Sequence, residues 1–265
     1  MKYVIITGAN GGIGKAVSDY LLKKNYSVIA LDISKEERKE KENYKYFQVD
    51  ITKDEDLKKV RDYLDKEKIE VFAIINLAGI FMLDSIIEGS EEKLRKIIEV
   101  NFFGMYKVNR AFFNYLVQNG RIINMASEVA RHTPQPFMAY YTMSKKMVDT
   151  YSDVLRRECN YLGIKVIKLY SGSMKTGMLG NAKDEYERMI KETKYFKKPL
   201  TKLKGMMDKE VNKTNDPLLV AKVIEKALTK RRPRLSYKIK NSLALSMMGS
   251  FNERFQDYIY KKVIN

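Results

Sequence analysis

The sequence predicts a single α/β domain with a doubly wound, mostly parallel sheet of seven strands flanked by helices. Two observations carry this prediction. Apolar runs alternate with helical patterns from the first residue, and no linker rich in glycine, proline or serine divides the 265 residues. Strand–helix alternation at this spacing requires right-handed crossovers, which place parallel strands in one sheet with helices on both faces. The length suffices to bury one large core.

Seven short runs of largely apolar, β-branched or aromatic residues are expected to form the strands, because such runs are typical of strands buried on both faces. They cover residues 3–7, 28–32, 47–50, 71–76, 121–125, 164–170 and 235–239.

The segments between these runs have a helical period or carry helix start and stop signals. The expected helices cover residues 14–24, 52–66, 91–118, 140–161 and 217–230. Thr52 to Glu55 should form a capping box, and Ser90 should cap the third helix, which Gly120 would stop. Asp216 followed by Pro217 should start the last of these helices.

Two segments depart from the alternation. Residues 177–214 form an insertion that is rich in lysine and methionine and has no strong period. Residues 241–265 form an amphipathic tail with apolar residues such as Leu243 and Phe255. We expect one α/β domain over residues 1–240, including the insertion, and a helical tail over 241–265 that belongs to the same domain.

The charge balance is strongly basic, with 50 Lys and Arg against 33 Asp and Glu, a net charge of +17. Clustered basic residues bind nucleic acid through counterion release. Here glutamates interleave with the lysines and no finger or basic-helix motif is present, so lysines on solvated helix faces are the favoured interpretation and no specific nucleic-acid partner is expected. The single Cys159 excludes a disulfide framework and a cysteine-based zinc site, and no metal is expected.

No apolar run approaches the roughly 18–20 residues of a membrane-spanning helix, and the first residues lack a signal-peptide pattern. We therefore expect a cytoplasmic protein.

A glycine-rich turn, residues 7–14 with the sequence TGANGGIG, lies directly between the first strand and the first helix. Such a turn aims free helix N–H groups at a pyrophosphate and indicates a dinucleotide site of the Rossmann fold. Gly8, Gly12 and Gly14 let the backbone bend, approach the phosphates and pack the helix on the sheet. A purely structural turn is the alternative.

Asp32 ends the second strand, where the adenosine ribose of a bound dinucleotide would lie. A carboxylate there accepts hydrogen bonds from both ribose hydroxyls and repels a 2′-phosphate. Because Ile33 and Asn10 stand where basic residues could receive that phosphate, NAD is favoured over NADP. The alternative role of Asp32 is a turn former at the strand end.

With these motifs the chain resembles the short-chain dehydrogenase/reductase family over roughly residues 1–235, and its tail is similar to that of hydroxysteroid-dehydrogenase-like members. Further matching positions are Asp50, Asn76 to Gly79, Asn101 and Ser127, and a YxxxK motif, Tyr141 to Lys145, which begins 14 residues after the serine. The chain departs from the family at Ser171, where members usually have proline, and lacks their glycine-rich C-terminus.

The resemblance implies a catalytic set and an NAD site. The catalytic residues would be Asn101, Ser127, Tyr141 and Lys145. The cofactor-binding residues would be Gly8, Asn10, Gly12, Ile13, Gly14, Asp32, Ile33, Asp50, Ile51, Asn76, Ala78, Gly79, Tyr141, Lys145, Gly172, Ser173 and Thr176.

In this set Tyr141 would act as the general acid or base. A free phenol has a pKa near about 10, and an ammonium one helical turn away favours the phenolate. Lys145 would lower that pKa and hold the nicotinamide ribose, Ser127 would orient the substrate oxygen, and Asn101 would support a proton relay. The alternatives are an exposed Tyr141–Lys145 pair, Ser127 as a helix N-cap and Asn101 as a buried polar residue.

Apolar residues from three segments are expected to border the substrate, although each can instead belong to the core. They are Phe81, Met82, Leu83, Phe137, Met138, Met174, Met178 and Leu179. Arg131, Lys175 and Lys183 could meet a substrate carboxylate, and His132 is expected in a loop or at the substrate rim.

The expected function is therefore an NAD(H)-dependent oxidoreductase that interconverts a secondary alcohol and a ketone. The substrate is expected to be bulky and hydrophobic, such as a hydroxysteroid or a bile acid. The alternatives are a non-catalytic NAD(H)-sensing protein and a reductase of sugars or small carbonyls.

The family resemblance also suggests a homodimer or homotetramer that packs through the helices at 91–118 and 140–161. The tail could cover the substrate, pair with a second subunit or lie on a membrane surface.

Overall fold

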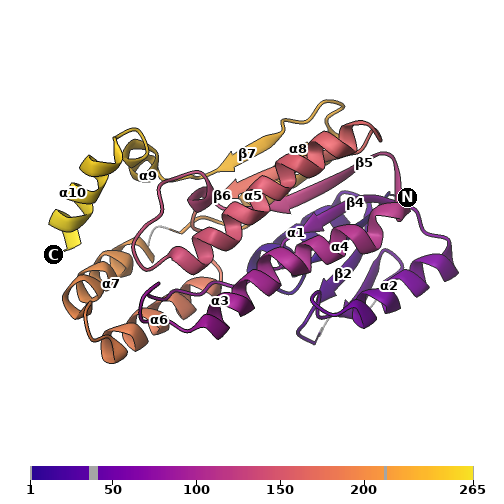
Figure 1. Cartoon of the computed structure of the whole chain (residues 1–265). Helices are drawn as coiled ribbons and strands as arrows, with labels where there is room; N and C mark the ends of the chain where they lie inside the picture. The colour runs from indigo at the N-terminus through magenta and orange to yellow at the C-terminus, as the bar shows by residue number, and fades with distance from the viewer. Residues whose placement is uncertain (1, 36–40, 212–213, 265) are drawn as a thin grey trace.

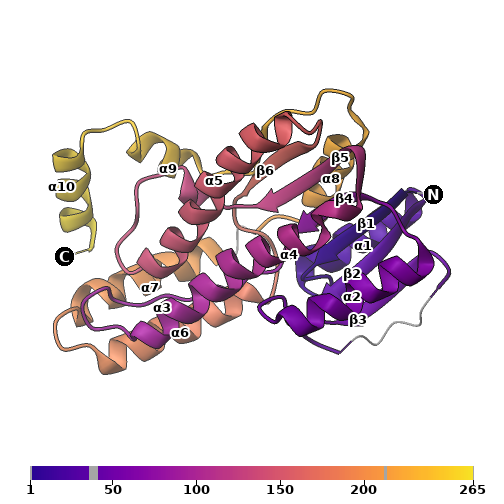
Figure 2. The same cartoon turned by 45° about the vertical axis from the view of Figure 1, so that its right-hand side comes forward.

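The structure is a computed structural model that describes residues 2–35, 41–211 and 214–264, with the backbone alone at 178–181 and 209–211. A central sheet carries helices on both faces, and a helical hairpin and the C-terminal tail lie together at one end of it (Figures 1 and 2). The expected doubly wound α/β fold is confirmed.

All seven strands of the sheet are parallel, in the order β3-β2-β1-β4-β5-β6-β7. They are β1 (Lys2–Thr7), β2 (Tyr26–Asp32), β3 (Tyr44–Gln48), β4 (Val71–Asn76), β5 (Leu116–Met125), β6 (Lys165–Ser171) and β7 (Ser236–Ile239). The strand order reverses between β1 and β4. Ligands of open α/β sheets bind outside the carboxyl ends of the strands at such a switch point.

Helices fill the crossovers between the strands. They are α1 (Gly12–Lys23), α2 (Asp54–Glu67), α3 (Glu91–Ile98), η1 (Glu99–Gly104), α4 (Met105–Phe112), η2 (Phe113–Tyr115), η3 (Glu128–Ala130), α5 (Ala139–Asn160), α6 (Met178–Glu192), α7 (Lys197–Val211), α8 (Leu218–Thr229), α9 (Leu243–Met248) and α10 (Glu253–Ile264). One core packs α1 and α8 on the sheet, and a second core packs α2, α4 and α5 on the opposite face.

The helix expected over 91–118 begins as predicted, with Ser90 as its N-cap, but it ends before residue 116. It continues through the π-helical η1 and α4 to the short η2, and β5 begins at Leu116. Gly120 therefore lies inside a strand instead of stopping a helix. The strand begins earlier than expected because Leu116 already pairs with Val71. The register shifts after this pair, so the first residues of β5 do not show the regular apolar pattern that predicts a strand.

The capping box expected at Thr52 is absent, because Lys53 is the N-cap of α2 and makes no side-chain hydrogen bond there. Instead, the amide and hydroxyl of Thr52 donate to Asp50 Oδ1 at 3.0 and 2.7 Å. Asp50 thus organises the turn that leads into α2.

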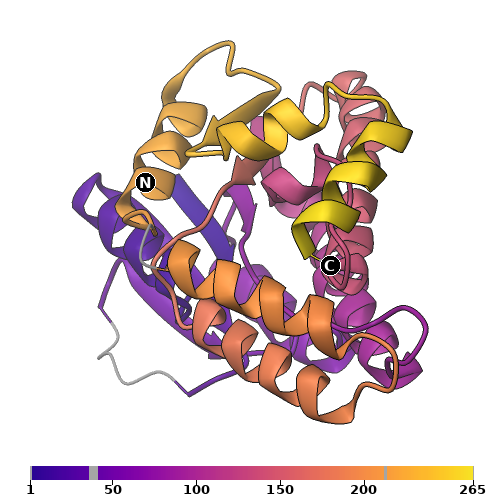
Figure 3. The same ribbon diagram turned by 90° about the vertical axis from the view of Figure 1, so that its left-hand side faces the viewer.

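The insertion over 177–214 contains the helical hairpin α6–α7, so the expectation that this segment has no strong period is wrong: Ala182, Tyr186 and Met189 recur at a helical spacing on the buried side of α6. A third apolar cluster, which includes Tyr186, Met189 and Leu200, holds the hairpin together. The tail forms α9 and α10, and α10 rests on α7 (Figure 3). Within the described ranges, no helix combines the length and the hydrophobicity needed to cross a bilayer.

Candidate active site

The turn between β1 and α1 has the close packing that a glycine-rich phosphate loop requires. Gly8 adopts a φ of +67°, which L side chains rarely adopt. A Cβ at Gly14 would lie 1.9 Å from the Gly8 carbonyl oxygen, and one at Gly12 would lie 2.7 Å from Thr176 Cγ2. The loop is therefore restricted to glycine at these positions, and Thr176 covers it from the far side of the site.

The N-terminus of α1 is open to a ligand. Its N-cap, Gly11, has no side chain to cap the free N–H groups, and both Gly11 and Gly12 are exposed. The partial positive charge of a helix N-terminus and its free N–H groups favour a phosphate there. This part of the chain therefore fits the pyrophosphate of a dinucleotide.

The loop is joined to the segment that follows β4. Thr7 Oγ1 accepts hydrogen bonds from the amides of Leu77 and Ala78, both at 3.2 Å. A Cβ at Gly8 would lie 2.8 Å from Ala78 Cα. The two turns that start at the switch point therefore pack against each other, and they place Gly79 beside Lys145, whose Nζ would lie 3.5 Å from a Cβ at residue 79.

Asp32 lies at the end of β2 and binds the loop around it. Its carboxylate accepts hydrogen bonds from the amide of Asn10 at 2.9 Å and from the amide and hydroxyl of Ser34 at 3.0 and 2.8 Å. The neighbouring Ile33 is 66% exposed. The structure thus places both Asn10 and Ile33 next to the carboxylate, as the cofactor assignment requires.

Two of the expected cofactor-binding residues have side chains that are engaged in contacts within the chain. The Asn76 side chain donates to Asn109 Oδ1 at 2.8 Å and to Asn124 Oδ1 at 2.9 Å, in a buried amide network below the site. The Ile51 side chain is buried against Gly104. Contacts of Asn76 and Ile51 with a cofactor remain predictions, and the amide network has no motif that the sequence would reveal.

The expected acid–base residues lie together at the carboxyl end of β5. Tyr141 and Lys145 are one turn apart on α5, and Ser127 follows β5 and is hydrogen bonded to Tyr141. Lys145 Nζ donates to the Met125 carbonyl oxygen at 3.0 Å and lies 5.8 Å from the centre of the Tyr141 ring. Ser127 also caps the short η3, through a 3.4 Å hydrogen bond from the Val129 amide.

Burial dominates the acidities of this group. Desolvation raises the pKa of Tyr141 to about 12; the hydrogen bond with Ser127 lowers it, and the nearby Glu128 carboxylate raises it further. Desolvation also lowers the pKa of Lys145 to about 8. Both shifts favour the neutral side chain, as burial does for any ionisable group.

Asn101 lies in the π-helical η1 and connects the β4 side of the site to α5. Its Oδ1 accepts from the Ile80 amide at 2.7 Å, and its Nδ2 donates to the Ile80 carbonyl oxygen and to Ser144 Oγ, both at 3.0 Å. π-Helical turns often mark functional sites. The side chain is buried and fully used in these bonds, so the role of Asn101 in a proton relay stays a prediction.

The segment after β6 carries Gly172, Ser173 and Thr176, which are expected on the nicotinamide side. A Cβ at Gly172 would lie 2.1 Å from the Lys240 carbonyl oxygen, which explains a glycine here beside Ser171. The Ser173 carbonyl oxygen accepts from the amide and side chain of Asn215 at 3.1 and 3.0 Å. These bonds fix the backbone of the segment without a proline.

The expected substrate-bordering residues divide into two groups. Phe81 contacts the Tyr141 ring at 4.8 Å between centroids, and Phe137 and Met138 pack with Phe81 in the cluster of the α6–α7 hairpin. Leu83 and Met174, in contrast, are buried in apolar clusters. The side chains of Met178 and Leu179 lie outside the described residues.

The remaining expected contacts are more distant from Tyr141. Lys175 and Lys183 are exposed, and Arg131 stacks on the Tyr170 ring at 5.2 Å. His132 is buried and lines a separate cavity of about 830 Å³ between the 131–134 loop and α10, which none of the four expected catalytic residues lines. Desolvation, together with Arg131 and Lys238, lowers the pKa of His132.

Comparisons with known proteins agree with this architecture. The family model described as short chain dehydrogenase matches residues 2–187. The 17-beta-hydroxysteroid dehydrogenase type 6 of Rattus norvegicus is 30% identical over 261 residues, which cover 89% of this chain and 80% of that protein. A solved short chain dehydrogenase family protein from Francisella tularensis superposes with a TM-score of 0.75 at 24% identity, over 90% of this chain and 96% of that one.

Estradiol 17-beta-dehydrogenase 2 of Mus musculus is 29% identical over 204 residues, which cover 72% of this chain but 52% of that protein. The chain thus matches about half the length of that relative. Because the family model covers well over half of the sequence and the sheet has the family's strand order, the chain belongs to the short-chain dehydrogenase/reductase family of oxidoreductases.

Proposed function

We propose that this chain is an NAD(H)-dependent oxidoreductase that interconverts a secondary alcohol and a ketone on a bulky hydrophobic substrate. The observation that carries the proposal is the hydrogen-bonded pair of Ser127 and Tyr141, with the Lys145 amine on the same face of α5. Membership in a family of oxidoreductases that act on CH–OH groups supports it.

The residues around the switch point fit a dinucleotide. The loop of Gly8, Gly12 and Gly14 and the open N-terminus of α1 would hold the pyrophosphate. Asp32 would bind the adenosine ribose. When bound, the nicotinamide supplies or accepts the hydride of the reaction.

Tyr141 would transfer the proton at its hydroxyl oxygen, because removing hydride from an alcohol carbon requires the loss of the hydroxyl proton. Burial is the main reason that the pKa of Tyr141 is raised to about 12, so the phenol needs a cation beside it to ionise near neutral pH. Lys145 is the cation that the chain can supply there. Ser127, one hydrogen bond from Tyr141, would donate to the substrate oxygen and stabilise charge that develops on it.

The preference for NAD depends on Asp32. Solved relatives of this fold include 4-hydroxyisoleucine dehydrogenase complexed with NADH and a short chain dehydrogenase from Burkholderia cenocepacia in complex with NADP, so the fold admits both cofactors. A carboxylate at the end of β2 repels the 2′-phosphate of NADP. Its position beside Asn10 and Ile33, neither of them basic, supports NAD.

The apolar residues next to Tyr141 support a hydrophobic substrate. Phe81, Phe137 and Met138 belong to one cluster on the side of the site that faces the α6–α7 hairpin. Relatives named as hydroxysteroid and estradiol dehydrogenases favour a hydroxysteroid-like alcohol over a sugar.

The replacement Tyr141→Phe tests the proposal. With NAD and a panel of hydroxysteroids, retinoids, sugars and small ketones, we expect kcat to fall by about 10²–10⁴-fold, the typical contribution of a general acid or base. NADH binding, followed by its fluorescence, should persist. Tyr140→Phe is the matched control, since the Tyr140 hydroxyl donates to the Ser90 carbonyl oxygen at 3.0 Å, away from the site.

Substantial turnover by Tyr141→Phe would overturn the mechanism. If the unaltered protein binds NADH but converts no compound of the panel, the sensing alternative gains support over the enzyme.

A further inference from the structure

We propose that Arg188 on α6 is a positioning residue that holds the α6–α7 hairpin closed over the substrate site by pairing with the buried Asp84. The inference deepens the proposed function, on which it rests, because it assigns the element that closes the hydrophobic side of the site. Arg188 touches neither Tyr141 nor the expected cofactor residues, so its effect is exerted through the hairpin.

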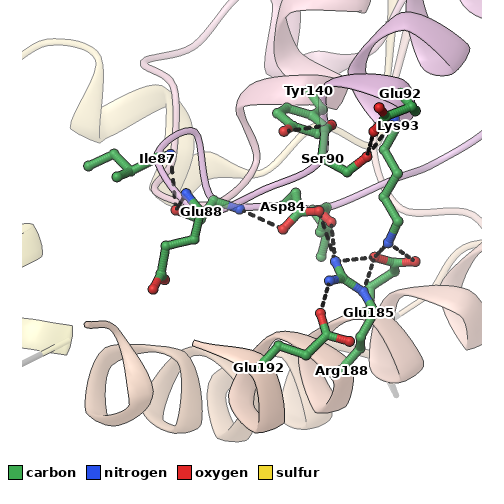
Figure 4. Close-up of polar contacts among 12 residues, drawn as sticks. Asp84, Ile87, Glu88, Ser90, Glu92, Lys93, Tyr140, Glu185, Arg188 and Glu192 are labelled. Carbon is green, nitrogen blue, oxygen red and sulfur yellow. Dashed lines mark hydrogen bonds and ion pairs between the residues drawn. The ribbon is translucent and has the colours of Figure 1, made fainter. Parts of the chain in front are cut away.

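Arg188 lies at the centre of a charged cluster between α6 and the loop that follows β4 (Figure 4). Its Nη2 is 3.0 Å from Asp84 Oδ2 and 3.0 Å from Glu185 Oε2, and its Nη1 is 2.6 Å from Glu192 Oε2. Glu185 and Glu192 lie on α6 itself, one turn to either side of Arg188. Asp84 is the partner on the other element, so the Arg188–Asp84 pair joins the hairpin to the body of the domain.

The environment of Asp84 makes this pair important. The residue is 4% exposed, while Arg188 is partly exposed. An ionised carboxylate in such a place is costly unless it is paired, and removing one partner of a buried pair is far more damaging than losing a surface ion pair. Asp84 Oδ1 accepts from the Ser85 amide at 3.0 Å, which leaves Arg188 as the cation for Oδ2.

Weaker contacts flank the pair. Lys93 on α3 lies 3.2 Å from Glu185, and Glu88 accepts from the Thr193 hydroxyl at 2.6 Å and the Lys194 amide at 2.7 Å. The first contact joins α3 to α6, and the second joins the loop after β4 to the residues that follow α6, but their side chains are more exposed than Asp84. Partly exposed pairs contribute less than buried ones, so the Asp84–Arg188 pair should dominate.

The loop that carries Asp84 is in direct contact with the catalytic region. Phe81, three residues before Asp84, contacts the Tyr141 ring in an edge arrangement. A Cβ at Gly89 would lie 2.6 Å from both Asp84 Cγ and the Tyr140 hydroxyl oxygen, so the loop is packed tightly against the residue that precedes Tyr141. Holding α6 on this loop therefore also holds the apolar wall beside Tyr141.

The same helix contributes to that wall. Tyr186 and Met189, on either side of Arg188, pack with Leu83 and Phe81 in one apolar cluster. Opening of the hairpin would remove this cover and admit water. The ion pair thus sets how often the hydrophobic side of the site is closed, which affects substrate binding more than the proton transfer at Tyr141.

The test compares Arg188→Gln with Arg156→Gln. Arg156 has nearly the same side-chain exposure, 27% against 28%, and pairs with Asp153 on its own helix α5. By hydrogen exchange without substrate, we expect amides of α6 to exchange about tenfold faster in Arg188→Gln, as for a loss of about 1.4 kcal/mol in closing free energy. Arg156→Gln should leave α6 unchanged.

Kinetics give the second readout. With an alcohol that the unaltered protein oxidises, Arg188→Gln should raise KM severalfold and leave kcat and NADH binding close to those of the parent. The double variant Asp84→Asn/Arg188→Gln removes the buried unpaired carboxylate that Arg188→Gln alone leaves at Asp84. It should recover part of the lost KM and protection, which also keeps the test valid if Arg188→Gln alone folds poorly.

Unchanged exchange of α6 in Arg188→Gln, or equal effects of the Arg156 and Arg188 variants, would overturn the inference. The exchange measurement needs no substrate, so it can fail or succeed whether or not the protein oxidises alcohols. Absence of turnover in the unaltered protein would count against the proposed function alone.

Discussion

Among single residues, Asp32 has two connected tasks. Its carboxylate holds the Asn10 amide and both polar groups of Ser34, so it shapes the edge of the cofactor site. In the proposed dinucleotide site, the same negative charge would face the 2′-phosphate of NADP. A substitution there therefore changes both the loop and the cofactor preference, and the two effects must be separated.

Replacing Asp32 by Asn and, in a second variant, by Ser achieves this separation. Asn retains a side-chain oxygen that can accept from Ser34, whereas Ser loses most of the loop contacts. Because both changes remove the negative charge, we expect both to raise the ratio of kcat/KM with NADP to that with NAD by about tenfold, the effect of removing one repulsive contact. Initial rates with both cofactors measure the ratio, and an unchanged ratio in both variants would contradict the assignment.

The sequence predicts the positions of the chemistry-bearing side chains well, because their spacing reflects geometry. Tyr141 and Lys145 are one turn apart and must share a helix face, and Ser127 follows a strand that ends at the same edge of the sheet. Their partners were not predictable. Lys145 donates to the carbonyl oxygen of Met125, and backbone groups leave no signature in the sequence.

The stability of a helix depends on how the free N–H groups of its first turn are capped, and α3 shows this. Ser90 Oγ accepts from the Lys93 amide at 3.3 Å, and α3 continues through η1 into α4, which packs in the core. Ser90→Ala should therefore lower the free energy of unfolding by about 1 kcal/mol, the usual worth of an N-cap. Urea denaturation followed by circular dichroism measures it.

Ser242→Ala is the matched control, since Ser242 caps the six-residue α9 with a hydrogen bond of the same 3.3 Å length. None of the residues of α9 is buried, so the loss of this cap should leave the global unfolding transition in place. Equal losses in the two variants would show that α9 unfolds with the core.

At the scale of elements, local sequence was a good guide where a segment packs on the sheet and a poor one elsewhere. The strands and α5 face a continuous core, so their apolar residues recur at a regular period. The α6–α7 hairpin packs on itself and on Phe81, Leu83, Phe137 and Met138, and its apolar residues do recur at a helical spacing, at 182, 186, 189 and 190 and at 200, 203 and 207. The expectation missed this spacing because the hairpin does not pack on the sheet and many lysines lie between its apolar residues. The polar link through Arg188 has no motif at all.

Over the whole molecule, exposed apolar side chains remain at several places on the described part of the chain, and two of these places are candidates for contact with a second subunit. One includes Phe103 in η1 and Val154 on α5, which are 41% and 49% exposed. The other lies on the tail, where Leu243 and Met247 are 81% and 63% exposed. Exposed apolar groups of this kind commonly mark contacts between subunits, and the two surfaces imply different assemblies.

We expect the chain to associate through the first surface, because η1 and α5 pack against each other and family members often form oligomers. Val154→Arg would place a charge inside that contact, at a cost of about 3 kcal/mol, which weakens association by more than about a hundredfold. Leu243→Asp disturbs only the tail. Light scattering after size exclusion should show a lower mass for Val154→Arg and the parent mass for Leu243→Asp. A lower mass for Leu243→Asp and the parent mass for Val154→Arg would assign the subunit contact to the tail. If both variants keep the parent mass, neither surface forms the subunit contact.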